Sequence, residues 1–260
     1  MDTDGLAAAL PAELPGLLRY ARTLTADAAQ AEDLVQATVV RALARAAGFR
    51  GDSSLATWLH RILHNLAVDD ARRSHEQPSE DVAETVEAMW REDDYTVDAA
   101  AVVVRAETRS DLREALSHLP TSYRTVVVLH DAEGMTMREI AEIQQVTLAA
   151  AKQRLRRARM MLVSQLATGQ ERPQTLRGVP MRCWEARRHI SDYLDGELEP
   201  VVARTVEKHL ETCPTCPPLY AALVGTTKAL GTSTARDPDT VVPVELAERL
   251  LGPPGAAAER

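Results

Sequence analysis

The sequence predicts an all-α protein built from several small helical units. The chain has 260 residues and a formal net charge of -8, with one Phe, three Trp and five Tyr. Ala, Leu, Glu and Arg are good helix formers, whereas sheets draw on aromatic and β-branched side chains. Apolar residues recur at helical spacing through 12–73 and 109–167, and segments rich in Pro, Gly or charge separate these stretches.

Shifts in composition divide the chain into six segments. We expect helical units over 10–75, 109–168 and 181–230, an acidic linker over 76–108, a second linker over 169–180, and a largely disordered tail over 231–260. Within 77–110 there are nine acids and three bases. Such a composition favours a flexible tether with, at most, helical ends.

The sequence excludes several classes of protein. No apolar run approaches the ~20 residues that cross a bilayer. Asp2 and Asp4 do not fit the basic start of a signal peptide. We therefore expect a cytoplasmic chain with no membrane partner. Nothing in 12–73 has catalytic spacing, and we expect no enzymatic activity.

Two apolar helical faces characterise the first unit. Leu34, Val35 and Val39 lie on one face, and Trp58 begins the other. Buried Trp commonly anchors helix packing, so Trp58 is expected in the core. The segment Phe49–Ser54 contains a glycine and two serines and is expected to be the loop between the two helices.

A helix-turn-helix pattern occupies the second unit. A helix over Tyr123–Ala132 is expected to end at Gly134. Thr136 and Glu139 then form the capping box of a short helix. A turn around Gln145 leads to a further helix, and this order is typical of DNA-binding modules.

That further helix is expected from Leu148, capped by Thr147, to about Leu166. Its predicted buried stripe consists of Leu148, Ala151, Leu155, Ala158 and Leu162. Five bases fall within Lys152–Arg159. A charge run alone is more often a solvated helix face. The capping box and the turn before it favour a DNA-reading helix.

The candidate DNA contacts on this helix serve different purposes. Lys and Arg neutralise phosphates, Gln and Arg can bond to base edges, and small residues at the helix start allow close approach to a groove. The candidates are Ala149, Ala150, Lys152, Gln153, Arg156 and Arg157.

All three cysteines lie in the third unit, where they suggest a metal site. Cys183, followed by the pattern His209-x3-Cys213-x2-Cys216, supplies four N and S ligands. Four such ligands with no open position describe structural tetrahedral zinc. Free buried cysteines or a redox pair are the alternatives.

Two of the units resemble known modules. Leu119-Pro120, Glu133–Thr136 and Ala151–Arg159 are similar to region 4 of the extracytoplasmic-function (ECF) RNA polymerase sigma factors. Gln145 and Ala150 stand where that family commonly has glycine and threonine. Residues 31–36, 49–54, 57–62 and 64–73 resemble region 2 of the same family, in the same order.

The resemblance implies partners and residue roles. Region 4 implies binding of the -35 promoter element through its second helix, and contact with the β flap of core RNA polymerase. Region 2 implies capture of a flipped -10 base, with Phe49, Arg50, Ser53, Arg61, His64 and Asn65 as candidates. Asp33 and Gln36 match positions that dock on the polymerase β′ clamp. From the residues alone, His60 and His64 are expected to be polar surface or interface residues rather than metal ligands.

The cysteine unit resembles the zinc anti-sigma domain through Cys183–Ala186, Ser191–Leu198 and His209–Cys216. In that family a small helical bundle binds zinc and wraps a sigma factor. Here it is covalently attached, and tethering raises its effective concentration. The resemblance implies contact between this domain and the sigma regions, and autoregulation.

The sequence therefore favours a sigma factor that directs promoter-specific initiation. A stand-alone helix-turn-helix regulator is the main alternative, and a zinc enzyme or a pure anti-sigma protein are others. Region 2 argues against the regulator, and a complete ligand set leaves no open metal position for catalysis.

Overall fold

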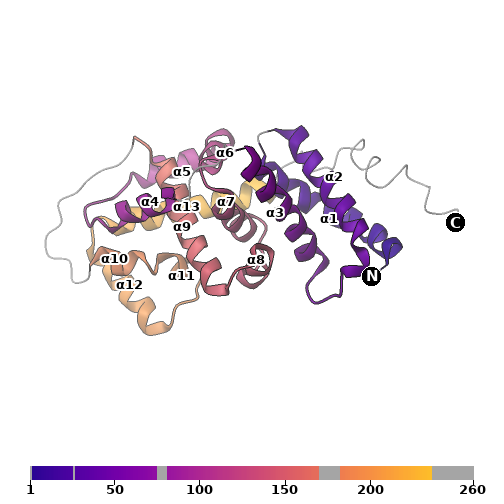
Figure 1. Ribbon diagram of the computed structural model, residues 1–260. Coiled ribbons are helices and arrows are strands. Elements are labelled where there is room, and N and C mark those ends of the chain that lie inside the picture. Colours follow the sequence, from indigo (N-terminus) through magenta and orange to yellow (C-terminus); the bar gives the residue numbers. More distant parts are fainter. Residues whose placement is uncertain (1, 26, 75–80, 170–181, 236–260) are drawn as a thin grey trace.

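The computed structural model describes residues 2–25, 27–74, 81–169 and 182–235, and these residues form helices with no β-strand. The predicted all-α fold is confirmed. Figure 1 shows α1–α3 at one end, the short C-terminal helices at the other, and α13 running through the middle. Most of the second linker and of the expected tail lies outside the described residues. No helix within the described part of the chain has the length and apolarity needed to span a membrane.

The first bundle consists of α1 (Thr3–Leu24), α2 (Ala28–Ala44), the 3-10 turn η1 (Ala46–Gly48) and α3 (Leu55–Ser74). Asp2 and Asp27 cap α1 and α2, since their carboxylates accept the backbone N–H groups of Gly5 and Gln30 at 2.9 and 2.8 Å. Trp58 is buried as predicted. The bundle therefore positions the 49–54 loop at the start of α3.

The segment expected as a flexible acidic tether holds two packed helices, α4 (Asp81–Arg91) and α5 (Ala99–Glu107). Trp90 is fully buried, and its Nε1 donates to Ser164 Oγ on α9 at 2.9 Å. Net composition was misleading here because the apolar residues of α4 share one helical face, while most of its acids lie on the other.

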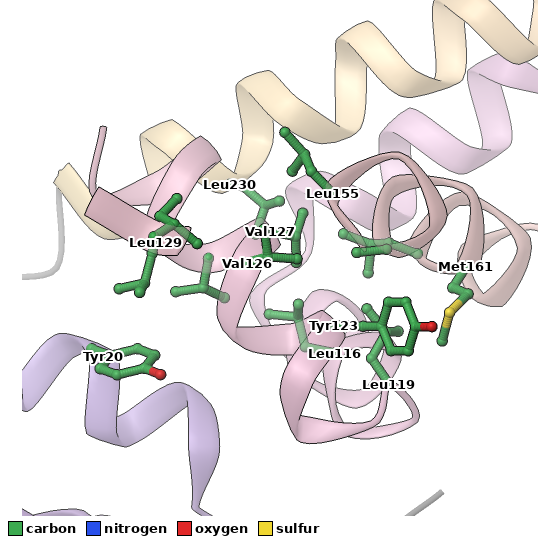
Figure 2. Packing of buried hydrophobic residues seen from close by; sticks show 14 of the residues in the cluster. Tyr20, Leu116, Leu119, Tyr123, Val126, Val127, Leu129, Leu155, Met161 and Leu230 are labelled. Carbon is green, nitrogen blue, oxygen red and sulfur yellow. The ribbon is translucent and has the colours of Figure 1, made fainter. Parts of the chain in front are cut away.

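The second bundle contains α6 (Arg109–Ser117), α7 (Thr121–Val127), the π-helical turn η2 (Val128–Ala132), α8 (Met137–Gln144) and α9 (Leu148–Leu166). Figure 2 shows part of the buried cluster to which Tyr123, Val126 and Leu155 of this bundle belong. The expected helix-turn-helix is present: Gly134 has φ +67°, and Thr136 with Glu139 forms the capping box.

Two details of this bundle concern the helix ends. Gln145 ends α8 in the left-handed conformation, with φ 54° and ψ 45°, at the position where the family commonly has glycine. Leu148 is 43% exposed, so its predicted place in the buried stripe is wrong. It lies in the first turn of α9, whereas the other four members of that stripe are buried.

The C-terminal domain comprises α10 (Cys183–Arg187), α11 (Ile190–Leu194), α12 (Pro200–Thr212) and α13 (Cys216–Ala235). The long helix α13 continues into the segment expected as tail. It packs along α5, η2 and α9, so the C-terminal domain is joined to the second bundle over a large surface (Figure 1).

The first bundle packs on the second through α1 and α3. The guanidinium of Arg19 donates to both carboxylate oxygens of Glu133, at 2.7–3.2 Å. Tyr20 Oη and Thr125 Oγ1 are 2.9 Å apart. These contacts bring the two bundles into one compact arrangement.

Gly225 permits the close approach of α13 to α5. A Cβ atom at this position would overlap the side chain of Val103, which is β-branched and stiff. We expect Gly225→Ala to destabilise the protein by about 1–3 kcal/mol, because overpacking outweighs the gain in helix propensity. Urea unfolding measures the change.

Gly16→Ala on α1 is the matched control. Its nearest neighbours would lie 3.7 and 3.8 Å from the new Cβ, which is ordinary contact. We expect this change to be neutral or to stabilise by about 0.5–1 kcal/mol. Equal effects of the two substitutions would contradict the proposed tight contact.

Candidate nucleic-acid interface and metal centre

The start of α9 is presented by the turn after α8 and capped by Thr147, whose Oγ1 accepts the N–H of Ala150 at 3.1 Å. Ala149 and Gln153 are exposed, and Ala150 is partly buried. The tip of the predicted DNA-reading helix is therefore accessible. Its basic flank is occupied, because each of its three basic candidates pairs with an acid from outside the helix-turn-helix.

Glu87 on α4 holds two of these bases. Arg157 Nε donates to Glu87 Oε2 at 2.6 Å, and Arg156 Nη2 donates to Glu87 Oε1 at 3.2 Å. Burial, the largest single effect, would raise the pKa of Glu87. The charges of Arg156 and Arg157, together with hydrogen bonds from Arg156 and Arg91, outweigh it and lower the pKa. Glu87 is thus an ionised carboxylate lying on the predicted phosphate-binding side of α9.

The C-terminal domain covers the same flank. Lys152 Nζ donates to Glu197 Oε2 at 2.7 Å, in a half-exposed pair. The Trp184 ring contacts two guanidiniums, with the Arg91 and Arg156 Cζ atoms 5.0 and 5.3 Å from its centroid. Cation–π contacts of this kind stabilise by about 0.5–1 kcal/mol each at exposed sites.

Arg159, in the same basic run, is buried rather than exposed. Its side chain is 2% exposed and donates to Asp131 Oδ1 at 2.6 Å and to Asp195 Oδ2 at 2.7 Å. Asp131 belongs to η2 and Asp195 follows α11. Arg159 therefore joins α9 both to its own bundle and to the C-terminal domain.

Of the six residues predicted to contact the -10 element, five are at least partly exposed and one is buried. Arg50 and Asn65 are exposed, and Ser53 and Arg61 are partly buried. Phe49 packs against Trp58, with ring centroids 5.3 Å apart. These five residues lie in the loop before α3 and along α3 up to its middle, and each is at least partly exposed to solvent.

His64, the sixth candidate, is 6% exposed and lies beneath the second bundle. Its Nδ1 is 3.2 Å from Thr125 Oγ1 and 3.3 Å from Tyr20 Oη. In this arrangement it cannot contact a base, so that assignment requires the bundles to separate. The expectation of an interface residue fits the observed position. Burial, with a smaller effect of Arg154, lowers the pKa of His64 to about 4.

The predicted polymerase contacts lie on α2. Asp33 is exposed and Gln36 is partly buried. Both precede the exposed Val40, on a helix whose other face packs against α1 and α3. This surface is separate from the interface between the bundles.

Cys183, His209, Cys213 and Cys216 come together in one buried cluster. Their ligand atoms all lie within 4.8 Å of one another. The sulfurs of Cys183 and Cys213 are 3.6 Å apart, and His209 Nε2 is 3.2 Å from the Cys216 sulfur. Two 2.3 Å zinc–sulfur bonds at a tetrahedral angle would separate their sulfurs by about 3.8 Å, whereas a disulfide bond measures about 2.05 Å. The geometry fits a metal ion.

A network of hydrogen bonds joins this cluster to the α4–α5 connection. Arg187 is buried and donates to the carbonyl oxygens of Trp90, Glu92 and Tyr95 at 2.7–2.9 Å, and to the Cys216 sulfur at 3.3 Å. The carboxylate of Asp93 accepts the N–H of Cys183 at 3.1 Å. The metal centre and the segment that carries Glu87 are therefore one structural unit.

Glu87, Arg159 and Arg187 were not singled out from the sequence. The sequence pattern could have pointed to Glu87. This residue shares the apolar face of α4 with Ala83 and Trp90, and a charged residue on such a face indicates a buried partner. Arg159 followed the predicted stripe residue Ala158, but its partners are 28 and 36 residues away. Periodicity does not reveal pairs so distant in sequence.

Comparison with protein families identifies three modules. Residues 12–77 match the model of Sigma-70 region 2, and residues 109–162 match Sigma-70, region 4. Residues 183–216 match a putative zinc-finger. All four clustered Cys and His residues fall within the last match.

Curated sigma factors are similar to between half and two thirds of this chain. RNA polymerase sigma-H factor of Pseudomonas aeruginosa is 30% identical over 51% of this chain and 71% of that protein. ECF RNA polymerase sigma factor EcfG of Rhodopseudomonas palustris is 30% identical over 62% and 84%. RNA polymerase sigma factor YlaC of Bacillus subtilis is 30% identical over 60% and 88%. A co-crystal structure of the sigma factor RpoE with the anti-sigma factor NepR from Bartonella quintana matches 63% of this chain and 96% of that chain, with 26% identity and a TM-score of 0.46.

The depressed pKa of His64 predicts that acid weakens the packing between the bundles. The neutral ring is favoured where it is buried, whereas a separated or unfolded chain takes up a proton near pH 6.5. The contribution of the neutral His64 ring to stability is therefore fully present above pH 6.5, and it is lost as the pH falls toward 4. We expect His64 to account for a loss of about 2 kcal/mol between neutral pH and pH 5, measured by urea unfolding.

His64→Gln should remove this part of the pH dependence. Burial also lowers the pKa of His60, and the contribution of His60 to the pH dependence of stability should remain in this variant. The exposed His118 provides the control, and His118→Gln should leave the dependence unchanged. An identical pH profile for His64→Gln and the unaltered protein would refute the assignment.

Proposed function

The chain belongs to the extracytoplasmic-function family of RNA polymerase sigma factors, and from this premise we propose that it is a sigma factor that covers its own promoter-reading surface. Its region 2 and region 4 modules bind RNA polymerase and promoter DNA. The C-terminal domain and α4 regulate that binding. The chain recognises promoters by non-covalent contacts, and we assign it no catalytic step.

The observation that carries the proposal is the pairing of α9 with acids from other elements. Arg156 and Arg157 bond to Glu87, and Lys152 bonds to Glu197. Carboxylates thus occupy positions where these side chains would meet DNA phosphates. A promoter must displace both acids before the helix can enter a major groove.

In the open state, different parts of the surface perform different tasks. We propose that Ala149, Ala150 and Gln153 approach the bases of the -35 element, while the three bases beside them neutralise phosphates. Phe49, Arg50, Ser53, Arg61 and Asn65 line the -10 site, which His64 joins only after the bundles separate. Asp33 and Gln36 dock on the β′ clamp, and region 4 docks on the β flap.

We propose zinc as the ion of the C-terminal domain. Three thiolates and one imidazole suit zinc, and a complete set of four leaves no position for a substrate. Bound there, zinc supplies structural cross-linking of α10, α12 and the start of α13. The chain's own residues then do the regulatory work, because Arg187 holds the connection after α4 and thereby the position of Glu87.

Autoregulation follows from the covalent link. The C-terminal domain remains at high effective concentration near α9, so it closes again unless polymerase or promoter occupies the exposed surfaces. Because polymerase and promoters reside in the cytoplasm, we place the protein there. A stand-alone regulator would have no use for region 2, and a pull-down with purified core polymerase distinguishes the two functions.

Removing the covering charges should activate the protein. We expect the full chain with Glu87→Gln and Glu197→Gln to bind promoter DNA and to support run-off transcription by core polymerase about tenfold better than the unaltered chain. The matched control carries Glu84→Gln and Glu211→Gln, two exposed acids on α4 and α12.

Two results would contradict different parts of this proposal. If no variant associates with core polymerase, the sigma assignment fails. If all variants transcribe equally well, the sigma assignment stands but self-covering fails.

The metal proposal has its own test. We expect the purified full chain to contain one zinc per molecule, measured by mass spectrometry of the metal, and His209→Gln or Cys213→Ser to lose it and melt at a lower temperature. His189→Gln is the control, because His189 lies outside the cluster and should leave the metal content unchanged. A full complement of zinc in Cys213→Ser would exclude the proposed ligand set.

A further inference from the structure

A polar cleft lies between the two sigma bundles, alongside the contact of α3 with α7 and α8 (Figure 1). Its volume is about 560 Å³, within the range of roughly 300–1,000 Å³ that is usual for small-molecule sites. One wall comes from α2 and α3, and the other comes from the start of α7, the end of α8 and α9. Neither the metal cluster nor Lys152, Arg156 and Arg157 contribute to its described lining.

Two arginines of the first bundle line this cleft without a partner. Arg41 on α2 and Arg72 near the end of α3 are exposed. Within the described part of the chain, neither forms a hydrogen bond or an ion pair. Asp69 is the one acid among the described lining residues, and it is not paired with either arginine. Both guanidiniums are therefore available to a ligand.

A third arginine, on the second bundle, is held in position. Arg154 Nη1 donates to Gln144 Oε1 at 3.0 Å, and Gln144 Nε2 donates to the carbonyl oxygen of Ser122 at 2.6 Å. This chain of bonds uses one N–H group of Arg154 and fixes its guanidinium at the wall of the cleft. No carboxylate among the described residues pairs with Arg154. Burial and, to a smaller extent, this uncompensated charge lower the pKa of His64.

The lining favours an anion with a polar body. Three arginines against one acid leave the cleft positive, and a guanidinium presents its N–H groups in a geometry that suits phosphate oxygens. The exposed amides of Asn65 and Gln145 lie in the same cleft. An amide both donates and accepts hydrogen bonds, so these two side chains suit the uncharged polar groups of a ligand.

We propose that this cleft binds a phosphorylated small molecule of nucleotide size. Its phosphates bond to Arg41, Arg72 and Arg154, and its polar body lies against the two amides. An inorganic ion is too small to fill 560 Å³, and an uncharged nucleoside would leave the guanidiniums without an anion. Because the arginines belong to both bundles, the ligand joins the bundles across the cleft.

A ligand in this cleft opposes promoter binding, and this step rests on the proposed function. His64 and Asn65 line the cleft and are two of the residues that we assign to the -10 element. His64 reaches DNA only after the bundles separate, whereas the ligand contacts both bundles while they are together. The ligand therefore shifts the population toward the closed form and lowers promoter binding.

Binding is tested on the full chain by calorimetry with four compounds. ADP and GDP carry both features, adenosine lacks the phosphates, and pyrophosphate lacks the polar body. We expect a dissociation constant below about 1 mM for at least one of the two nucleotides, and values at least tenfold higher for adenosine and pyrophosphate. The tighter of the two nucleotides identifies the preferred base.

The double variant Arg41→Gln with Arg72→Gln removes two charges at exposed positions. Because hydrogen bonds between charged groups are stronger than neutral ones, it should weaken binding of the better nucleotide at least tenfold. The matched control is Arg45→Gln with Arg204→Gln, two exposed arginines outside the cleft, and it should keep the affinity. Thermal melts confirm that each variant folds, and the single substitutions replace the pair if it melts early.

Three outcomes would overturn the site: neither nucleotide binds, adenosine or pyrophosphate binds as tightly as the better nucleotide, or loss of Arg41 and Arg72 leaves the affinity unchanged. If a single strand of six thymidylates binds through these arginines and neither nucleotide does, the cleft is instead a surface for DNA.

The regulatory step has a separate test. A saturating nucleotide should reduce binding of -10 promoter DNA by the complex with core polymerase, and unchanged binding would overturn this step. The nucleotide titrations use no polymerase, so failure of the proposed function would leave their result standing.

Discussion

The ionic contact of Arg159 with Asp131 and Asp195 is the interaction on which the closed arrangement depends. A guanidinium that is 2% exposed is costly to bury unless several acceptors surround it. Here two carboxylates provide them, one from η2 and one from the C-terminal domain. Asp131 lies in the π-helical turn η2, in which the Glu133 N–H donates to the Val128 carbonyl oxygen. The buried charge of Arg159 thus joins α9 to η2 and to the C-terminal domain.

The metal centre extends this arrangement to the acidic segment. Arg187 is fixed by carbonyl oxygens at the end of α4 and by the sulfur of Cys216. Thr215, between two of the cysteines, donates to the Asp93 carbonyl at 3.0 Å and accepts from Arg187 at 3.0 Å. The cysteine knuckle therefore recognises a particular backbone shape in the segment before α5. A free-standing domain of this kind would need to find the segment by diffusion, whereas a tethered domain needs only to remain closed.

Most of the helices were predictable because they depend on short-range patterns. The contacts of Glu87 and Glu197 with α9 were not, because they join residues far apart in the sequence. Capping by Thr136 and Thr147, the glycine at 134 and the four-residue spacing of His209 and Cys213 are short-range patterns with direct physical causes. The acidic segment was misjudged because net charge conceals which helical face each residue occupies. The basic run on α9 was correctly located, but sequence spacing carries no information about Glu87 or Glu197 as its partners.

The same geometry is compatible with the opening that we propose, because the buried charge of Arg159 would keep a partner. Removing one member of a buried ion pair is costly, since the remaining charge has neither partner nor water. Arg159 has two carboxylate partners, and Asp131 belongs to its own bundle. In the proposed open form Arg159 would lose Asp195 but keep Asp131. The bonds between Glu87 and Arg156 or Arg157 are partly solvated already, with the arginine side chains 15% and 24% exposed. In the proposed function a DNA phosphate would replace each acid with a similar bond. Opening would then be an exchange of anions around α9, while the buried charge of Arg159 stays paired with Asp131.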